Sequence, residues 1–355
     1  MNNPLVSVVV PVFNREAILA ETVNSVLDQQ NANIELLLID DGSTDRSLEI
    51  SKQFAEHDPR VKVIPRIHHK KGAPVCRNIG LDAAQGQYII FLDSDDLLAT
   101  DAIEKRMAAI SKDPALDFIV NPSVFFSVEI SDANTWWNVF DDRSDLDRFL
   151  LQDVVWQTAG PTWNRSFLLN NNLRFNEEAE TSQDWEFHLR CLMLQPKYIK
   201  MPVPDSFIRR GSTQDTISSK HFSPANQLNR IALVLSILES LRDSSLRVKM
   251  PLLVSKLVEE YIMQLNSKQS PSFAEAEQFF REALKLENRL SPQINYLKTG
   301  TRLFKMSPFL YKIYRKFFFR KIFVSSLYPA SKYRTPITPD ELRSLPHLLN
   351  KMPQS

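Results

Sequence analysis

The stretch Phe91-Leu92-Asp93-Ser94-Asp95-Asp96 ends an apolar run in three carboxylates. The run starts at Tyr88 and reads as a buried strand. Acids at the carboxyl end of such a strand stand where open α/β sheets bind their ligands. Adjacent carboxylates repel one another unless a cation neutralises them, and their oxygens suit Mg²⁺ or Mn²⁺. Taken alone, the stretch fits a metal site and also a helix start capped by Asp95 or Asp96.

The segments before this stretch alternate between strand-like and helix-like patterns. Strands are predicted at residues 6–12, 34–39, 61–64 and 88–92, and helices at 17–27, 44–54, 74–84 and 99–110. Strands that are apolar throughout and alternate with helices form parallel sheets covered on both faces. We therefore predict an α/β fold with a doubly wound, mostly parallel sheet. No GxGxxG follows the first strand, which disfavours a dinucleotide-binding site.

The pattern changes beyond residue 117. Residues 117–212 combine short strands, aromatic-rich loops and one clear helix near 183–194, and we expect the tryptophans there to pack rather than stack on sugars. Helical spacing then dominates, at 227–241, 252–265 and 273–286. We expect an α/β domain over residues 1–221 and a helical C-terminal region over residues 222–355.

Composition limits the classes of function. The net charge of +1 gives no general attraction to nucleic acid, and the two cysteines form neither a zinc pattern nor a disulfide framework. The first residues lack the basic segment and cleavage site of a signal peptide, and no apolar run reaches the roughly 20 residues of a membrane span. We expect a cytoplasmic protein, with peripheral attachment to the inner face of the cell membrane left open.

Residues 302–334 motivate that option. They interleave basic and aromatic side chains and contain no acid; among them are Arg315, Arg320, Lys305, Lys312, Lys316, Lys321, Lys332, Phe304, Phe309, Tyr311, Tyr314, Phe317, Phe318, Phe319 and Phe323. Such a segment can lie on an anionic membrane surface, where each basic residue contributes about 1 kcal/mol. The alternative is a helix that packs its aromatic face within its own domain or against a partner subunit.

A second acidic cluster, Asp40-Asp41-Gly42-Ser43-Thr44-Asp45, follows the strand predicted at residues 34–39. Alone it fits a helix start, because Asp and Ser are common N-cap residues. Together with Asp93 and Asp95, it gives one sheet two acidic strand ends, and neighbouring strands would open both into one crevice. Coincidence is then a poor explanation.

These motifs resemble those of glycosyltransferase family 2, inverting enzymes with the GT-A fold. The likeness covers most of residues 5–100 and extends more weakly to about 220. It rests on four motifs in the family's order and spacing: Val8-Val9-Val10-Pro11-Val12-Phe13-Asn14, Ile39-Asp40-Asp41-Gly42-Ser43-Thr44-Asp45, Arg77-Asn78-Ile79-Gly80-Leu81 and Phe91-Leu92-Asp93-Ser94-Asp95-Asp96.

The resemblance implies a nucleotide-diphospho-sugar donor, most simply UDP-linked. Pro11 and Asp41 would border the base, with a carboxylate accepting the uracil N–H. Asp93 would face the ribose, and Asp95 would hold the Mn²⁺ or Mg²⁺ that bridges the phosphates. The remaining donor-site candidates from these motifs are Phe13, Asn14, Asp40 and Ser94.

Arg77 fits the site on chemical grounds, because an arginine beside an acidic crevice could pair with Asp41 or approach the donor phosphate. Its alternative is a surface position. The family also places its catalytic base in a Glu-Asp-Trp/Tyr sequence that opens a helix. Here the sequence is Gln183-Asp184-Trp185-Glu186, so Asp184 is the candidate base and Gln183 departs from the pattern.

Three further positions accompany the base. Glu186 is the reserve candidate, although it lies about 200° around a helix from Asp184. His188, one turn from Asp184, could orient it, but a surface histidine is the simpler expectation. An arginine-bearing loop follows, in which Arg209, Arg210 and Ser218 are candidates for stabilising the leaving group.

We therefore predict a metal-dependent inverting glycosyltransferase. Its acceptor would be a hydroxyl of a glycan or a lipid-linked molecule, in the synthesis of surface polysaccharide or a glycoconjugate. The helical C-terminal region would serve homo-oligomer, membrane or acceptor contacts, with no role in nucleic-acid binding. The alternatives are a catalytically silent sugar-nucleotide or partner-binding module, and a sugar-phosphate nucleotidyltransferase, which would carry a glycine-rich loop where this chain has Pro11 to Asn14.

Overall fold

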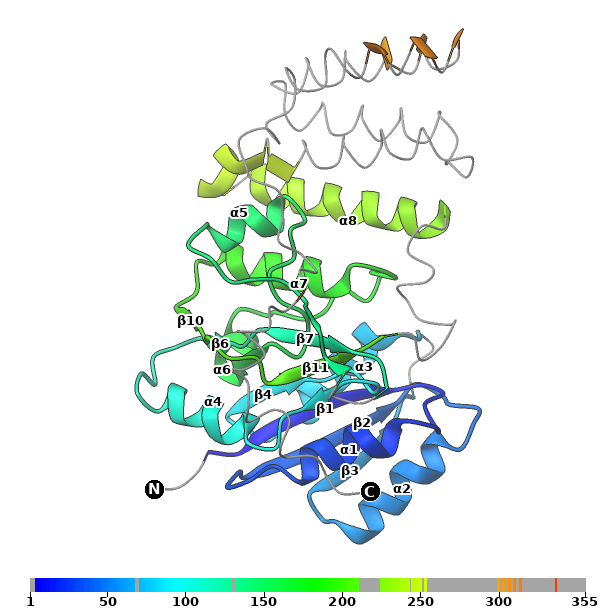
Figure 1. The fold of residues 1–355 in the computed structure, drawn as a ribbon, viewed down its shortest axis with the longest axis vertical. Coiled ribbons are helices and arrows are strands. Elements are labelled where there is room, and N and C mark those ends of the chain that lie inside the picture. The colour runs from blue at the N-terminus through cyan, green and yellow to red at the C-terminus, as the bar shows by residue number, and fades with distance from the viewer. Residues whose placement is uncertain are drawn as a thin grey trace.

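The computed structural model describes residues 4–67, 70–128, 132–210, 224–242, 244–250 and 252–253, with further single residues and pairs between 299 and 336. It confirms the α/β fold class (Figure 1). The main sheet has seven strands in the order β10-β6-β9-β4-β1-β2-β3. Their bounds are Tyr198–Lys200, Phe118–Val120, Pro161–Asn164, Tyr88–Phe91, Val6–Val12, Ile34–Asp40 and Val61–Pro65 in that order. Only β9 runs antiparallel to its neighbours, so the sheet is mostly parallel, as predicted.

Helices cover both faces of this sheet. One face packs against α1 (Leu19–Leu27), α2 (Ser47–His57) and α4 (Ala102–Ile110). The other packs against α3 (Ala73–Ala83), α5 (Asp145–Leu150), α6 (Arg165–Asn170), α7 (Gln183–Met193) and α8 (Pro224–Arg242). In β1, Val8 and Val10 face the first layer, whereas Val9 faces the second. Burial on both faces explains why the strands are apolar throughout.

A second, smaller sheet lies beside the acidic loop. Its order is β5-β11-β7-β8, with bounds Leu97–Leu98, Ser206–Arg209, Ser123–Phe126 and Thr135–Trp136. The predicted helix at 99–110 was placed too early, because β5 pairs with β11 and α4 begins only at Ala102. Asp95 and Asp96 therefore cap no helix. The pairing instead brings Arg209 at the end of β11 to the acidic loop.

Residues 117–210 contain short strands and the helix α7, as predicted. Trp156 and Trp163 are fully buried, which confirms packing for these two, whereas Trp136 and Trp137 are half-buried. The sequence did not predict the short helices α5 and α6, whose N-caps are the Ser144 and Asn164 side chains.

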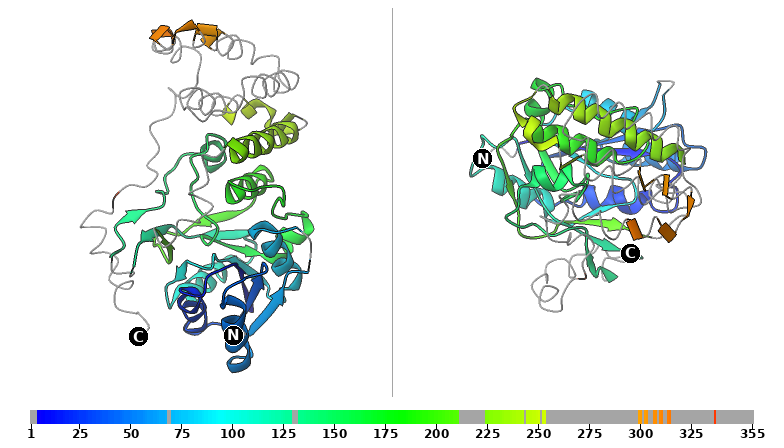
Figure 2. Two further views of the ribbon diagram at one scale, coloured as in Figure 1. Left: turned by 90° about the vertical axis from the view of Figure 1, so that its right-hand side faces the viewer. Right: turned by 90° about the horizontal axis from the view of Figure 1, so that it is seen from above.

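The start of the C-terminal region is helical, as predicted, and α8 is followed by a short 3-10 helix, Ser245–Lys249. Figure 2 shows α8 stacked over α7, on the side of the sheet away from α1 and α2. Leu233 and Leu238 of α8 belong to the same core cluster as Val9 and Phe91. The predicted domain boundary near residue 221 stays a prediction.

Of the helix predicted at 252–265, only residues 252–253 are described. The helix predicted at 273–286 and most of residues 302–334 lie outside the described residues. Within the described part of the chain, no helix combines the length and apolar character needed to cross a membrane.

Candidate functional site

The two acidic clusters emerge at the same edge of the main sheet. They follow β2 and β4, which both run parallel to β1. The expectation that these two strands are neighbours was wrong, because β1 lies between them. In the register Val12 of β1 stands beside Asp40, so the loop that follows β1 lies between the two clusters. That loop carries Phe13 and Asn14.

Polar contacts hold the loop after β1 against the loop after β2. The Asn14 side-chain oxygen accepts from the Thr44 N–H at 2.8 Å, and the Asn14 N–H donates to the Ser43 hydroxyl. Asp40 turns back onto its own loop, where its carboxylate accepts from the N–H of Gly42 at 3.0 Å and from that of Ser43. Asn14 and Asp40 thus hold the two loops in place.

Phe13 and Pro11 occupy contrasting positions in the same segment. Pro11 is buried within β1, opposite Ile39 of β2. The Phe13 side chain is 45% exposed. An exposed aromatic ring beside the carboxyl end of β1 offers a flat surface to a nucleotide base. Pro11 instead forms part of the buried strand.

Asp41 has a different partner from the one expected. Its Oδ1 atom lies 2.5 Å from Nε of Arg66, and its Oδ2 atom accepts from the Gly72 N–H at 2.9 Å. Arg77 is not its partner. Arg66 directly follows β3, at the same sheet edge, and is itself largely buried. Sequence reasoning missed Arg66 because a single arginine after a short strand carries no motif.

Arg77 joins the second acidic loop to the helix that carries the candidate base. Its Nη2 atom lies 2.5 Å from Oδ1 of Asp93, and its Nη1 atom donates to the Gln183 side-chain oxygen at 3.0 Å. The guanidinium also lies over the Phe175 ring, 5.0 Å from the centroid. Arg77 is only 4% exposed, so the surface alternative is excluded.

Asp95 and Asp96 lie in a strongly acidic setting. Burial raises the pKa of Asp95, and the neighbouring Asp93 carboxylate raises it further. Burial also raises the pKa of Asp96 well above its usual value. Two arginines oppose this charge: Arg15 lies 3.6 Å from Oδ2 of Asp95, and Arg209 donates its backbone N–H to Asp96 and its Nε to the Asp95 carbonyl.

Arg209 has a structural role that the sequence did not reveal. Its side chain also bonds the Glu21 carboxylate at 2.6 Å and lies over the Phe126 ring. Arg209 therefore ties the second sheet to α1 and to the acidic loop. Ser94 is buried, and its carbonyl accepts from the Thr22 hydroxyl, so it fixes the same loop from the other side. Ser218 lies outside the described residues.

Asp184 stands at the first turn of α7. Its Oδ1 atom accepts from the Trp185 N–H at 2.8 Å. Burial raises its pKa; the Arg77 guanidinium lowers it and the Asp93 carboxylate raises it, which places Asp184 within electrostatic reach of both. A carboxylate with a raised pKa, within electrostatic reach of the Asp93 loop, has the properties of a general base.

Neither accompanying residue competes for that role. Glu186 is buried and bonds the Arg190 side chain at 2.6 Å and 2.9 Å. The expectation of a surface His188 was wrong: its ring is buried, stacked on Trp163, and burial lowers its pKa to about 3. The imidazole is therefore neutral and packed in the aromatic core.

A metal ion in this site would need ligands from the donor as well as from the protein. No group of three or more His, Cys, Asp or Glu side chains among the described residues is arranged to hold a metal by itself. Mg²⁺ is commonly bound by one or two carboxylates together with substrate phosphates. The partly exposed Asp95, whose pKa is raised by a second carboxylate, fits that pattern, because a cation would relieve the repulsion.

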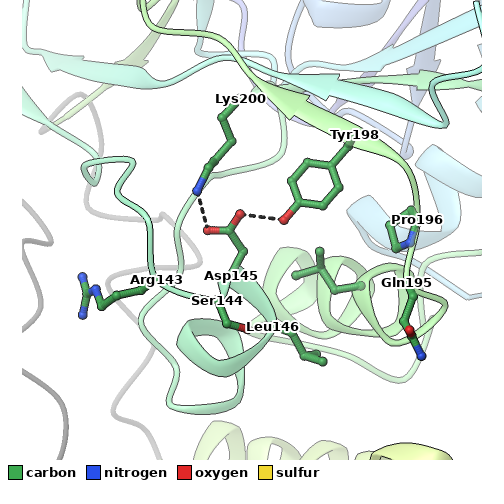
Figure 3. A pocket seen from close by; sticks show the side chains of 9 residues that line it. Arg143, Ser144, Asp145, Leu146, Gln195, Pro196, Tyr198 and Lys200 are labelled. Carbon is green, nitrogen blue, oxygen red and sulfur yellow. Dashed lines mark hydrogen bonds and ion pairs between the residues drawn. The ribbon is translucent and has the colours of Figure 1, made fainter.

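A cavity in the described part of the chain lies away from the acidic clusters. It measures about 430 Å³ and is bordered by α5, the end of α7 and β10. Figure 3 shows Asp145 there, bonded to Tyr198 at 2.6 Å and to Lys200 at 3.2 Å. None of its lining residues belongs to the acidic clusters. Its two cations already have carboxylate partners, Lys200 with Asp145 and Arg143 with Asp141, so we take the sheet edge as the candidate site.

Residues 7–171 match the family model "Glycosyl transferase family 2". An uncharacterized glycosyltransferase of Haemophilus influenzae is 50% identical over 107 residues, which are 30% of this chain and 42% of that protein. A putative teichuronic acid biosynthesis glycosyltransferase, TuaG of Bacillus subtilis, is 36% identical over 148 residues, 41% of this chain and 52% of the relative. The chain spans about half the length of the curated relatives it matches.

The fold is similar to that of S. aureus TarS 1–349, solved in complex with UDP-GlcNAc. The TM-score is 0.60 at 20% identity, over 79% of this chain and 80% of the other. Residues 7–171 therefore resemble glycosyl transferase family 2, and the chain has a fold similar to the GT-A fold of TarS.

Proposed function

We propose that this protein is a metal-dependent inverting glycosyltransferase that moves a sugar from a UDP-linked donor to an acceptor hydroxyl. The observation that carries the proposal is the pair of hydrogen bonds that Arg77 donates, one to Asp93 and one to Gln183. It joins the loop assigned to the donor with the helix start that presents Asp184. A donor whose ribose contacts Asp93 would thus lie near a carboxylate able to act as base.

The donor side follows the two acidic loops. Phe13 would cover the base, and Asp41, fixed by Arg66 and the Gly72 N–H, would accept from it. Asp93 would contact the ribose, and Asp95 would bind Mn²⁺ or Mg²⁺ on the diphosphate. A similar fold solved with UDP-GlcNAc is in keeping with a uridine donor.

The chemical step is a single displacement. Asp184 takes the proton from the acceptor hydroxyl. At the same time the acceptor oxygen forms a bond to the anomeric carbon, and the bond from that carbon to the diphosphate breaks. The nucleoside diphosphate leaves with the electron pair, and inversion results from attack on the opposite face. A bound divalent ion would stabilise the negative charge on the leaving group. Such a base typically contributes a factor of about 100 to 10,000 in rate.

The acceptor is proposed from chemistry and relatives together. A relative named for teichuronic acid biosynthesis supports a surface polysaccharide or a lipid-linked precursor. A membrane-bound acceptor would also explain a group of exposed apolar residues near residue 310. Its members are Met306, Phe309, Leu310 and Ile313. The protein would then work at the cytoplasmic side of an anionic membrane.

The test is a titration of UDP by calorimetry, with and without Mn²⁺, followed by an assay of transfer from UDP-, GDP- and dTDP-sugars. We expect UDP to bind with Mn²⁺ and one UDP-sugar to be consumed. Asp95→Ala should abolish the metal-dependent part of UDP binding, whereas Asp82→Ala, in an exposed pair with Arg174, should not. Binding without turnover of any donor would favour a silent module, and pyrophosphate release from UTP and a sugar phosphate would indicate a nucleotidyltransferase.

A further inference from the structure

Arg15 bridges the two halves of the donor site. Its Nη1 atom donates to the carbonyls of Phe13 and Asn14, at 3.4 Å and 3.1 Å. Its Nη2 atom lies 3.6 Å from Oδ2 of Asp95. The side chain therefore spans from the loop after β1 to the loop after β4. No sequence motif assigned it a role.

The arginine backbone is fixed while its side chain is only loosely held. The Arg15 N–H donates to the Ser47 hydroxyl at 2.7 Å. By contrast, the Nε atom is buried without a hydrogen-bond partner in the described part of the protein, and the contact with Asp95 exceeds hydrogen-bond length. A guanidinium with an unused donor, next to the place assigned to a diphosphate, is suited to forked binding of phosphate oxygens.

A metal ion on Asp95 would compete with this arginine. Both cations would need the same partly buried carboxylate, and like charges at such separations repel strongly where water screens poorly. The neighbouring Asp93 is already paired with Arg77 through its Oδ1 atom. The diphosphate of the donor would supply the negative charge that allows the metal ion and Arg15 to remain in the site together.

We propose that Arg15 couples metal binding to donor binding: it neutralises Asp95 when no donor is present and moves to the diphosphate when the metal takes Asp95. The inference rests on the proposed function, because it requires a metal-assisted nucleotide donor. It predicts that the metal alone binds weakly and that UDP and metal strengthen each other's binding by the same factor. Arg15 is thus a positioning residue that sets the order in which the site fills.

The experiment measures Mn²⁺ binding by electron paramagnetic resonance of the free ion, with and without UDP. The full chain would be compared with Arg15→Gln, Arg15→Lys and the control Arg46→Gln, whose side chain is exposed and pairs with Glu49. In the unmodified protein, UDP should tighten Mn²⁺ binding at least about tenfold. In Arg15→Gln, Mn²⁺ without UDP should bind about fivefold more tightly, and the effect of UDP should fall below about threefold. Arg15→Lys keeps the charge but not the fork, so metal alone should stay weak.

The outcomes separate the inference from the function on which it rests. If the unmodified protein binds Mn²⁺ with UDP but Arg15→Gln behaves like it, the coupling role is wrong and the metal assignment stands. The coupling role is also wrong if Mn²⁺ binds the unmodified protein equally well without UDP. If Mn²⁺ binds under neither condition, the metal-dependent function is wrong and the coupling with it. Circular dichroism of each variant establishes that the comparison is between folded proteins.

Discussion

The Arg77 guanidinium of α3 lies 2.5 Å from the Asp93 carboxylate, and the same group bonds the Gln183 side chain at the start of α7. The α3 helix is placed for this by Gly80, where a Cβ atom would lie 2.2 Å from a methyl group of Val9. A close approach of α3 to the sheet brings Arg77 to the end of β4. Helix packing thus positions a charge between donor loop and base.

Removing that charge should damage both binding and stability. Arg77→Met leaves Asp93 without its partner and Gln183 without its donor, so we expect UDP affinity to fall at least about tenfold and stability to drop by about 1–3 kcal/mol. Calorimetry and urea unfolding measure the two effects. Arg60→Met, which removes a more exposed pair with Asp58, is the matched control. Equal behaviour of the two variants would remove Arg77 from the site.

Loss of the base should separate chemistry from binding. Asp184→Asn keeps the shape but cannot accept the proton, so turnover should fall by a factor of about 100 to 10,000 while UDP affinity stays within about twofold. Steady-state assays and UDP titration provide the two readouts. Glu186→Gln is the control: it weakens the bond to Arg190 and should lower stability more than turnover. Transfer by Asp184→Asn at nearly the normal rate would place the base elsewhere.

His188 should make the fold sensitive to mild acid. Its pKa is lowered to about 3 in the folded protein, whereas an unfolded histidine titrates near 6.5. The unfolded state therefore takes up the proton first, and stability is lost as pH falls from 6.5 toward 3. Between pH 7.5 and 5 this loss is about 2 kcal/mol.

The check is urea unfolding across that pH range for the unmodified protein, for His188→Phe and for the exposed His57→Gln. His188→Phe keeps a ring against Trp163 but removes the proton site. Its stability should fall about 2 kcal/mol less over the range than that of the other two proteins. Parallel curves for all three would show that His188 does not set the acid response.

Motif and apolar pattern together predicted the parallel sheet, the acidic loops and the helix of Asp184. These features depend on local rules, since strand burial and loop chemistry are written in consecutive residues. The partners of the individual ion pairs were harder to predict from the sequence. A pairing of Arg77 with Asp41 was one of two alternatives, but Asp41 bonds Arg66, because the strand order sets β2 beside β3 and that order is not encoded in any one segment.

Two further misses have the same origin. The residues Leu97–Leu98 fit a helix by composition, yet they pair with β11, whose position depends on contacts more than 100 residues away. His188 looked like a surface residue because a polar ring in an amphipathic helix usually faces water. It is buried because the aromatic residues that surround it come from α5, β9 and the loop before β9.

The exposed helix face near residue 310 should bind anionic lipid. Met306 and Phe309 are 75% and 69% exposed, and Leu310 and Ile313 are 42% and 41% exposed. Phe309, Leu310 and Ile313 are helical, and residues three or four positions apart lie on the same side of a helix. Residues 288–339 contain eleven lysines and arginines and no acid, so attraction to anionic lipid would add to shallow burial of these side chains.

Sedimentation with vesicles decides between this surface and simple exposure. We expect the full chain to sediment with vesicles containing phosphatidylserine, weakly with phosphatidylcholine alone, and less as salt rises. Phe309→Ser with Ile313→Ser should reduce binding to the anionic vesicles at least about fivefold, because both the apolar contribution and the depth of insertion are lost. Val248→Ser, at an apolar position that is more exposed than either, beside α8, is the control and should bind normally. Equal sedimentation of all three proteins, or of none, would mean that this helix face does not bind the membrane.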